Sequence, residues 1–275
     1  MRILDSRRPD RRVPLNGRVP PDGDAVLHWA VVDEGDDAPM TDVRGADVPG
    51  PDVEDAGAMD GVTIAAPAHD CALCPRLAAY RAANAKAEPG WFNGPVPSFG
   101  PTDASLLVVG MAPGVKGANR TGRPFTGDHA GLLLYSTLLR FGHARGEYRA
   151  SADDGVELIE TRITNAVRCV PPANLPEPAE VTTCNPYLRG ELQALPQLRA
   201  VLALGVLAHA AVLKACGIPP SRIRFRHGAM HELPDGLILA NSYHVSRYNT
   251  NTGRLTTEMF EAVMFALGQK LAATA

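Results

Sequence analysis

The chain has 275 residues, of which 45% are hydrophobic and 21% charged, an ordinary composition for a globular protein of one or two domains. It has no apolar run of about 18 residues, and no apolar stretch follows the basic N-terminus, so we expect no membrane span, no secretory signal and a cytoplasmic location. The net charge of −3 hides an asymmetry, because residues 1–65 hold 7 Lys or Arg and 14 Asp or Glu, whereas residues 66–275 hold 20 and 16.

Residues 1–60 are rich in Pro, Gly and Asp and contain one short apolar run. They hold too few apolar side chains to build a core, so the sequence predicts a disordered acidic tail over 1–60 and a folded domain over 61–275. The 5 cysteines are too few for a disulfide scaffold in a chain of this length and indicate metal or redox chemistry instead.

Strand and helix patterns alternate from about residue 100 onward. Continuous apolar runs predict buried strands over 105–110, 162–167, 199–205 and 236–241. Helical patterns lie between and after them, over 131–141, 186–195, 206–216 and 256–271. This order predicts an α/β fold in three layers (αβα), with a central, mainly parallel four-stranded sheet. In such sheets the site lies beyond the carboxyl ends of the strands, so it should use the loops after Gly110, near Asn165 and after Asn241.

Four cysteines form two local pairs, Cys71 with Cys74 and Cys169 with Cys184. Their thiolates could surround one metal centre, and the spacing alone does not choose between tetrahedral zinc and a [4Fe–4S] cluster. Isolated buried cysteines or a disulfide remain the alternatives. Cys216 lies in an apolar helical run and is interpreted as a small core residue.

The loop after the first strand is rich in glycine but lacks the Gly-Lys-Ser/Thr ending of a phosphate-binding P-loop. Arg120 and Arg123 add positive charge to it, and Phe125 offers a stacking surface. Asp128 is the only acid of the loop. It is a candidate functional carboxylate, or simply the N-cap of the next helix.

The other two loops carry polar side chains. Asn165 ends a strand and could present a donor and an acceptor to one ligand edge, or it could be a structural turn residue. Residues 241–254 contain His244, hydroxyls, arginines and aromatic side chains with almost no aliphatic ones. That composition is typical of a phosphate-binding loop.

Together these residues resemble the iron–sulfur uracil-DNA glycosylases over about Cys71 to Leu267. The cysteine arrangement, the segment 164–172 around Asn165 and the segment 122–127 around Phe125 are similar to motifs of that family. Met111 stands where the type-4 branch has Glu, and residues 117–128 and 249–256 resemble the type-5 branch. One departure is Val245, because the family usually has His-Pro-Ser where this chain has His244-Val245-Ser246.

The resemblance implies a monofunctional DNA-repair hydrolase that flips uracil out of DNA and hydrolyses its N-glycosidic bond. It implies a [4Fe–4S] cluster on Cys71, Cys74, Cys169 and Cys184. It implies catalytic roles for Asp128, His244 and Asn165, and a base-binding site at Met111, Phe125 and Asn165. DNA contacts would come from Arg120, Arg123, Ser246, Arg247, Tyr248 and Arg254. Its partner would be DNA containing uracil or other deaminated bases such as hypoxanthine, which associates it with the nucleoid, and we expect a monomer.

Three alternatives differ in chemistry. A non-catalytic, cluster-bearing nucleic-acid binding module would not need Phe125, Asn165 and His244 together. A zinc hydrolase would need an open coordination position, which four cysteine ligands do not leave. A bifunctional enzyme would need an amine nucleophile, for which Lys116 is the only lysine in the motif loops.

Overall fold

The computed structural model describes residues 64–273, so the predicted tail over 1–60 lies outside the described residues. The elements follow in the order α1 (Pro75–Ala87), β1 (Leu106–Gly110), α2 (Ala118–Thr121), α3 (His129–Arg140), β2 (Ala144–Arg145), β3 (Glu157–Leu158), β4 (Thr161–Asn165), η1 (Pro172–Asn174), α4 (Pro178–Ala194), β5 (Ala200–Leu204), α5 (Val206–Ala215), η2 (Pro220–Arg222), β6 (Met230–Glu232), β7 (Ile238–Ser242), α6 (Arg247–Asn251) and α7 (Thr257–Ala273).

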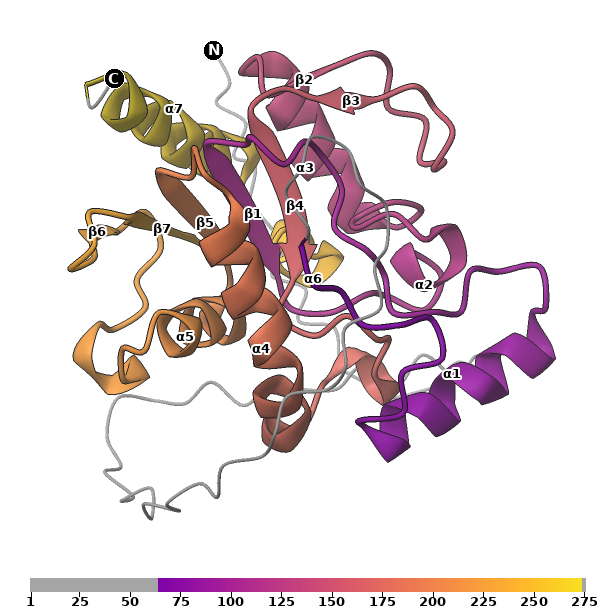
Figure 1. The fold of residues 1–275 in the computed structure, drawn as a ribbon. Coiled ribbons are helices and arrows are strands. Elements are labelled where there is room, and N and C mark those ends of the chain that lie inside the picture. The colour runs from indigo at the N-terminus through magenta and orange to yellow at the C-terminus, as the bar shows by residue number, and fades with distance from the viewer. Residues whose placement is uncertain (1–63, 274–275) are drawn as a thin grey trace, which may run out of the picture. The chain divides into compact units, whose positions relative to one another are not determined.

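The main sheet of the described residues has 5 strands in the order β4-β1-β5-β7-β6 (Figure 1). All neighbours are parallel except β6, which pairs with β7 in the antiparallel sense. The α/β prediction is confirmed, and each of the four predicted strands is present. The fifth strand was missed because β6 is a three-residue edge strand, Met-His-Glu, with no apolar run.

Two apolar layers cover the sheet, one on each face. Leu106 and Val108 pack with the buried side chains of α3 and α7, whereas Leu107 and Val109 pack with those of α4 and α5. Alternate strand residues therefore enter opposite layers, as expected of a strand buried on both faces. This is the three-layer arrangement that the sequence predicts.

Four α-helices differ from the sequence prediction, among them the short helix α2 in the loop after β1. Helix α4 begins at Pro178 rather than at 186, with Pro in its first turn and Glu180 bonded back to the Glu177 N–H at 2.7 Å. Pro186 lies inside it. The loop 241–254 contains the short helix α6, and α1 precedes the first strand. No helix of the described residues is both long enough and apolar enough to cross a bilayer.

Candidate active site

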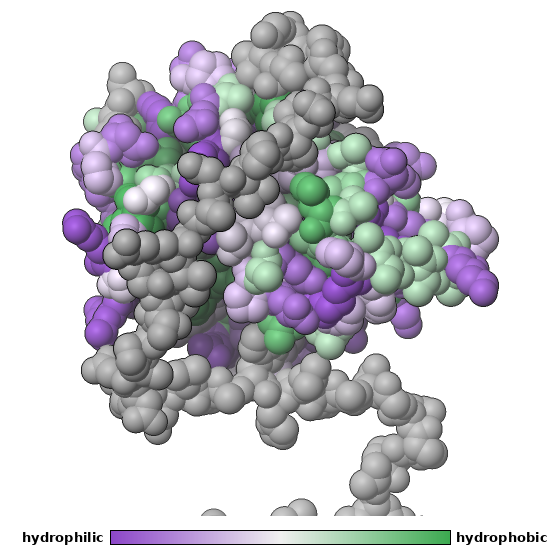
Figure 2. All heavy atoms as spheres, turned by 60° about the horizontal axis from the view of Figure 1, so that its bottom comes forward, coloured by the Kyte–Doolittle hydropathy of each residue, from purple (hydrophilic) through white to green (hydrophobic). Residues whose placement is uncertain are grey.

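The loops after β1, β4 and β7 meet at the carboxyl end of the sheet. The strands point their carboxyl ends to the bottom of Figure 1, and Figure 2 brings that end forward. The register places Gly110 beside Asn165 and Leu204 beside Ser242. Residues far apart in the sequence therefore reach one edge, where the sequence predicts the site.

Phe125, Asn165 and His244 come together at this edge. The Phe125 and His244 rings lie 6.0 Å apart between centroids, with their planes 33° apart. A Cβ atom at Gly110 would clash with both the Phe125 ring and Asn165 Oδ1. Phe125 therefore lies next to both Asn165 and His244, and glycine at 110 lets the Phe125 ring and the Asn165 amide approach the strand closely.

Asn165 holds an unused hydrogen-bond acceptor. The residue is 3% exposed, and its Oδ1 is buried without a hydrogen-bond partner among the described residues. Leaving such an atom unpaired costs about 1–3 kcal/mol. A polar ligand that donates to this oxygen would recover that free energy.

Phe125 is held in a strained backbone conformation. Its φ of 52° is in the left-handed region, which is unfavourable for a non-glycine residue. The Tyr148 hydroxyl donates to the Phe125 carbonyl at 3.1 Å, and the Tyr135 hydroxyl donates to the Pro124 carbonyl at 2.8 Å. Gly131 leaves room for this arrangement, because a Cβ atom there would clash with the Phe125 carbonyl and the Tyr148 hydroxyl. The ring orientation is therefore fixed by its supports.

His244 is neutral at physiological pH. Burial lowers the pKa of its imidazole to about 4, because a charged ring is poorly solvated there. The Asn249 side chain donates to the His244 carbonyl at 2.8 Å. Ser246 caps α6, and Val245 is fully buried in the core. A neutral imidazole can donate a hydrogen bond from one nitrogen while the other nitrogen stays unprotonated.

Asp128 is the N-cap of α3, as the structural interpretation of this residue predicts. Its Oδ1 accepts from the Ala130 N–H at 3.1 Å, and Oδ2 lies close to Gly114 and Gly117. Burial raises the pKa of this carboxyl, while backbone N–H groups of α3 oppose the rise. A half-buried carboxylate with one oxygen facing the glycine loop is both a cap and a candidate functional group.

The histidine next to it links two of the loops. His129 Nε2 lies 3.0 Å from Thr250 Oγ1, which joins the start of α3 to α6. No sequence motif indicates the His129–Thr250 contact or the Tyr148–Phe125 hydrogen bond, because each joins residues that are distant in the sequence. The same holds for the glycines that leave space around Phe125 and Asp128.

Arg123 does not lie where the sequence predicts it. Its side chain is 5% exposed, and its two terminal nitrogens donate to the two Asp154 oxygens at 2.7 and 2.8 Å. The guanidinium also lies over the Tyr135 ring at 5.2 Å. This packing does not support a phosphate contact by Arg123, and we propose a structural role for it instead.

The other predicted contact residues lie at the surface or near it. Arg120, Arg247 and Arg254 are exposed, and Tyr248 is 50% exposed. The Arg254 guanidinium lies 4.8 Å from the Tyr243 ring centroid. Met111 is half-buried, and its carbonyl accepts from the Val167 N–H at 3.0 Å.

The four predicted ligand cysteines line one pocket, together with apolar residues such as Leu77 and Val167. Cys74 is the N-cap of α1, Cys184 lies in α4, and Cys169 follows β4. Burial, followed by the neighbouring thiols, raises the pKa of Cys74 to about 11. A cation centre would be needed to hold these sulfurs as thiolates. In the described part of the chain, no group of three or more His, Cys, Asp or Glu side chains is arranged to hold a metal ion.

Two arginines support this pocket. Arg81 is buried and donates to the His69 carbonyl at 2.7 Å and to the Cys71 carbonyl. The Arg168 backbone N–H lies 3.4 Å from Cys184 Sγ, and its side chain pairs with buried Glu191. The spacing of residues in the sequence does not indicate either contact.

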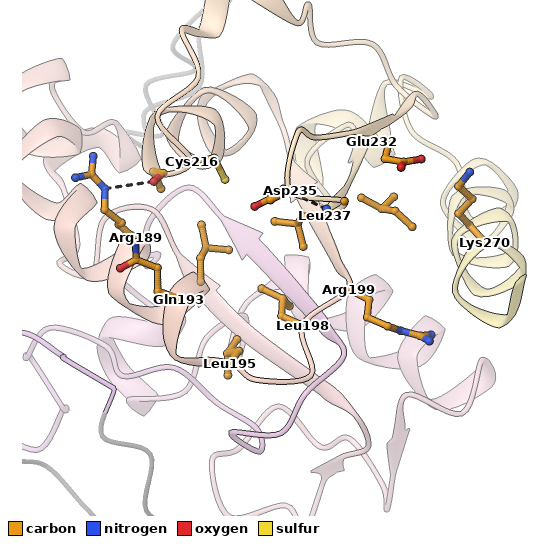
Figure 3. Close-up of a pocket in the computed structure, with 14 residues that line it drawn as sticks. Arg189, Gln193, Leu195, Leu198, Arg199, Cys216, Glu232, Asp235, Leu237 and Lys270 are labelled. Carbon is orange, nitrogen blue, oxygen red and sulfur yellow. Dashed lines mark hydrogen bonds between the residues drawn. The ribbon is translucent and has the colours of Figure 1, made fainter. Parts of the chain in front are cut away.

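Another cavity, of about 500 Å³, lies at the opposite end of the sheet (Figure 3). Its lining includes Arg199 and Ile238, which stand at the starts of β5 and β7, and Cys216 at the end of α5. Cys216 is half-buried, which agrees only in part with its interpretation as a core residue. None of the predicted site residues lines this cavity.

Comparisons with known proteins identify a family for this chain. The family model described as the uracil DNA glycosylase superfamily matches residues 97–268. The type-5 uracil-DNA glycosylase of Thermus thermophilus is 46% identical over 200 residues, which cover 70% of this chain and 90% of that protein. The type-5 enzyme of Pyrobaculum aerophilum is 43% identical, covering 71% and 86%. The type-4 enzyme of Sulfurisphaera tokodaii is 28% identical, covering 61% and 72%.

Proposed function

Because the chain belongs to the uracil DNA glycosylase superfamily, we propose that it is a type-5 DNA-repair glycosylase that hydrolyses the N-glycosidic bond of uracil in DNA. The observation that supports the proposal is that the Phe125 ring lies next to both the His244 imidazole and, across Gly110, the Asn165 amide. An aromatic face, a buried amide and a neutral ring donor are the groups that an extruded pyrimidine needs.

The base must leave the duplex before these groups can reach it. Extrusion costs a few kcal/mol and least at a mismatch, which favours U·G over normal pairs. Phe125 then stacks on the base, and the unpaired Asn165 Oδ1 accepts from its edge. His244 donates to the uracil O2 as negative charge grows on the leaving base. One such donor is worth about 3–4 kcal/mol of the barrier.

Asp128 serves the sugar side of the reaction. As the glycosidic bond breaks, the sugar becomes cationic, and a carboxylate can counter that charge and orient the attacking water. Its Oδ2 faces Gly114 and Gly117 rather than the helix it caps, so one oxygen remains for this role. Its raised pKa is consistent with partial removal from solvent.

Phosphate contacts would come from Arg120, Ser246, Arg247 and Arg254, without Arg123. Tyr248, half exposed on α6, would wedge into the base stack beside the extruded nucleotide. Met111, in place of the acid found in the type-4 branch, makes the pocket less polar. We therefore extend the proposed substrates to other deaminated bases such as hypoxanthine.

The four cysteines fit a [4Fe–4S] cluster in their chemistry and location. The four cysteines line one small pocket, and they come from the segment before α1, the α1 cap, the segment after β4, and α4. The arrangement of the sulfurs does not itself choose between tetrahedral zinc and an iron–sulfur cluster. We propose the cluster because the chain resembles the iron–sulfur uracil-DNA glycosylases. When bound, the cluster would supply a structural brace between these segments rather than a step of hydrolysis.

The decisive test is incubation with a U·G duplex followed by alkali, which breaks the strand at an abasic site. Wild-type protein should give a break, and Asp128→Asn should lose it while keeping the helix cap, because Asn caps as well as Asp. Asp128→Ala should lose both the break and about 1 kcal/mol of stability. No break with wild type would refute the proposal and favour a non-catalytic binding module.

A further inference from the structure

Three arginines lie between the end of η2 and residue 226. Arg222, Arg224 and Arg226 are exposed, while the residues between them, Ile223 and Phe225, are partly buried. Ile223 has an extended backbone, with φ −129° and ψ 107°. In an extended chain, alternate side chains point to the same side about 6.5–7 Å apart. The three exposed arginines therefore alternate with the two partly buried residues along this segment, and we call them the Arg222–Arg226 stripe.

The inward side chains fix this segment to the fold. His209 Nε2 lies 2.8 Å from the Ile223 carbonyl, and the Phe225 ring meets the His209 ring edge-on at 5.7 Å. The His227 ring stacks on Tyr243 at 4.8 Å, and its Nδ1 accepts from the Tyr243 N–H at 3.1 Å. The stripe is thus anchored to α5 and to the carboxyl end of β7.

The stripe has no charge partner within the described residues. None of its three side chains makes a hydrogen bond, ion pair or ring contact there, and residues 192–231 contain no Asp or Glu. Three other exposed arginines behave differently: Arg140 pairs with Glu261, Arg145 with Glu157 and Arg149 with Glu147. Three like charges in a row without carboxylates are suited to a polyanion.

The stripe lies next in sequence to His227, which contacts the loop that contains His244. Tyr243 precedes His244, and its ring contacts both His227 and the guanidinium of Arg254. Tyr243 therefore links Arg254 to His227, the residue that directly follows the stripe. Figure 2 shows hydrophilic residues along the left side of this face, the side on which α5 and β6 lie in Figure 1.

We propose that Arg222, Arg224 and Arg226 bind successive phosphates of the DNA strand that flanks the extruded nucleotide. The inference rests on the proposed function and extends its DNA contacts beyond the catalytic loops. Alternate residues of an extended chain are spaced on the scale of successive phosphates along one strand. The contact is to the backbone, so it adds affinity and register without sequence preference.

The test is the salt dependence of binding to a uracil-free duplex, measured by fluorescence anisotropy. Each phosphate contact contributes about 0.9 to the slope of log K against log salt. The triple variant Arg222→Ala, Arg224→Ala, Arg226→Ala should lower the slope by about 2–3. The corresponding triple Lys variant should keep most of it, because the positive charges remain.

The matched control is Arg140→Ala, Arg145→Ala, Arg149→Ala, which removes the same charge from arginines paired to carboxylates and should change the slope by less than about 1. Thermal melting identifies any variant that fails to fold. An equal change in stripe and control variants, or an equal loss in the Ala and Lys stripe variants, would overturn the inference and point to another anionic partner. Uracil release by wild type is measured in parallel, so failure of the proposed function is scored separately.

Discussion

Replacing Arg123 by Ala should unfold the protein more readily rather than weaken its hold on DNA. The Arg123–Asp154 pair is bidentate, and the two side chains are 5% and 0% exposed. Without Arg123, the Asp154 carboxylate keeps only the backbone donors of Arg149 and Val156, at 3.0 and 3.1 Å. Removing one partner of a buried ion pair costs about 3–5 kcal/mol, because the other charge stays buried and uncompensated.

The loss should have a pH signature. Burial alone would raise the pKa of Asp154, but hydrogen bonds from Arg123 and the backbone outweigh it and lower the pKa to about 2 from 3.8. The unfolded chain therefore binds the proton first as the pH falls. The pair contributes its full stability above pH 3.8 and loses roughly 2–3 kcal/mol as the pH falls to about 2.

Urea unfolding at neutral pH and at low pH measures both effects. Arg145→Ala is the control, because its exposed pair with Glu157 is worth only about 0–1 kcal/mol. The double variant Arg123→Leu, Asp154→Leu should recover much of the loss, since no charge is left buried. Two results together would instead support a phosphate contact by Arg123. The free energy of unfolding of Arg123→Ala would lie within about 0.5 kcal/mol of that of wild type, and the slope of log K against log salt for DNA binding would fall by about 1.

Other predictions concern the site and the cysteines. NMR of the His244 ring should show neutral imidazole down to about pH 4, and stability should fall from pH 6.5 to 4 as the unfolded state takes up the proton first. Asn165→Ala should slow uracil release about 100-fold without loss of stability, because a buried unpaired oxygen is removed. Gly131→Ala should lower the melting temperature, despite the better helix propensity of Ala, because its Cβ meets the Phe125 carbonyl. Cys184→Ser should reduce both the iron content and the melting temperature.

The sequence predicted the buried strands well because each is a short apolar run closed by Gly or a polar residue. It could not predict β6, whose pairing with β7 depends on the sheet edge rather than on its own Met-His-Glu sequence. The predicted start of helix α4 lies too late in the sequence because a proline, here Pro186, is typical of the first turn of a helix. The capping residues Glu177 and Glu180 were the better signal.

The topology of the sheet, rather than any local pattern, accounts for the part of the site that the sequence could indicate. Carboxyl ends of parallel strands converge, so Asn165 and His244 could be assigned to one edge from topology, and the motif around Phe125 joined them by resemblance. The packing of Arg123 could not be predicted, because a sequence shows that an arginine is present but not that Asp154, 31 residues later, will face it. Burial and partner are properties of packing, and no local pattern specifies them.

The loop around His244 shows how packing can replace a backbone constraint. The family usually has Pro between the His and the Ser, which fixes one φ angle; this chain has Val245, which leaves that angle free. The structure restrains the loop in other ways: Val245 is fully buried, Ser246 caps α6, and Asn249 bonds the His244 carbonyl at 2.8 Å. Each restraint depends on the folded core or on α6 rather than on one residue's covalent geometry. We therefore expect the backbone around His244 to become mobile when α6 unfolds. The position of the imidazole depends in the same way on the stability of the core that buries Val245.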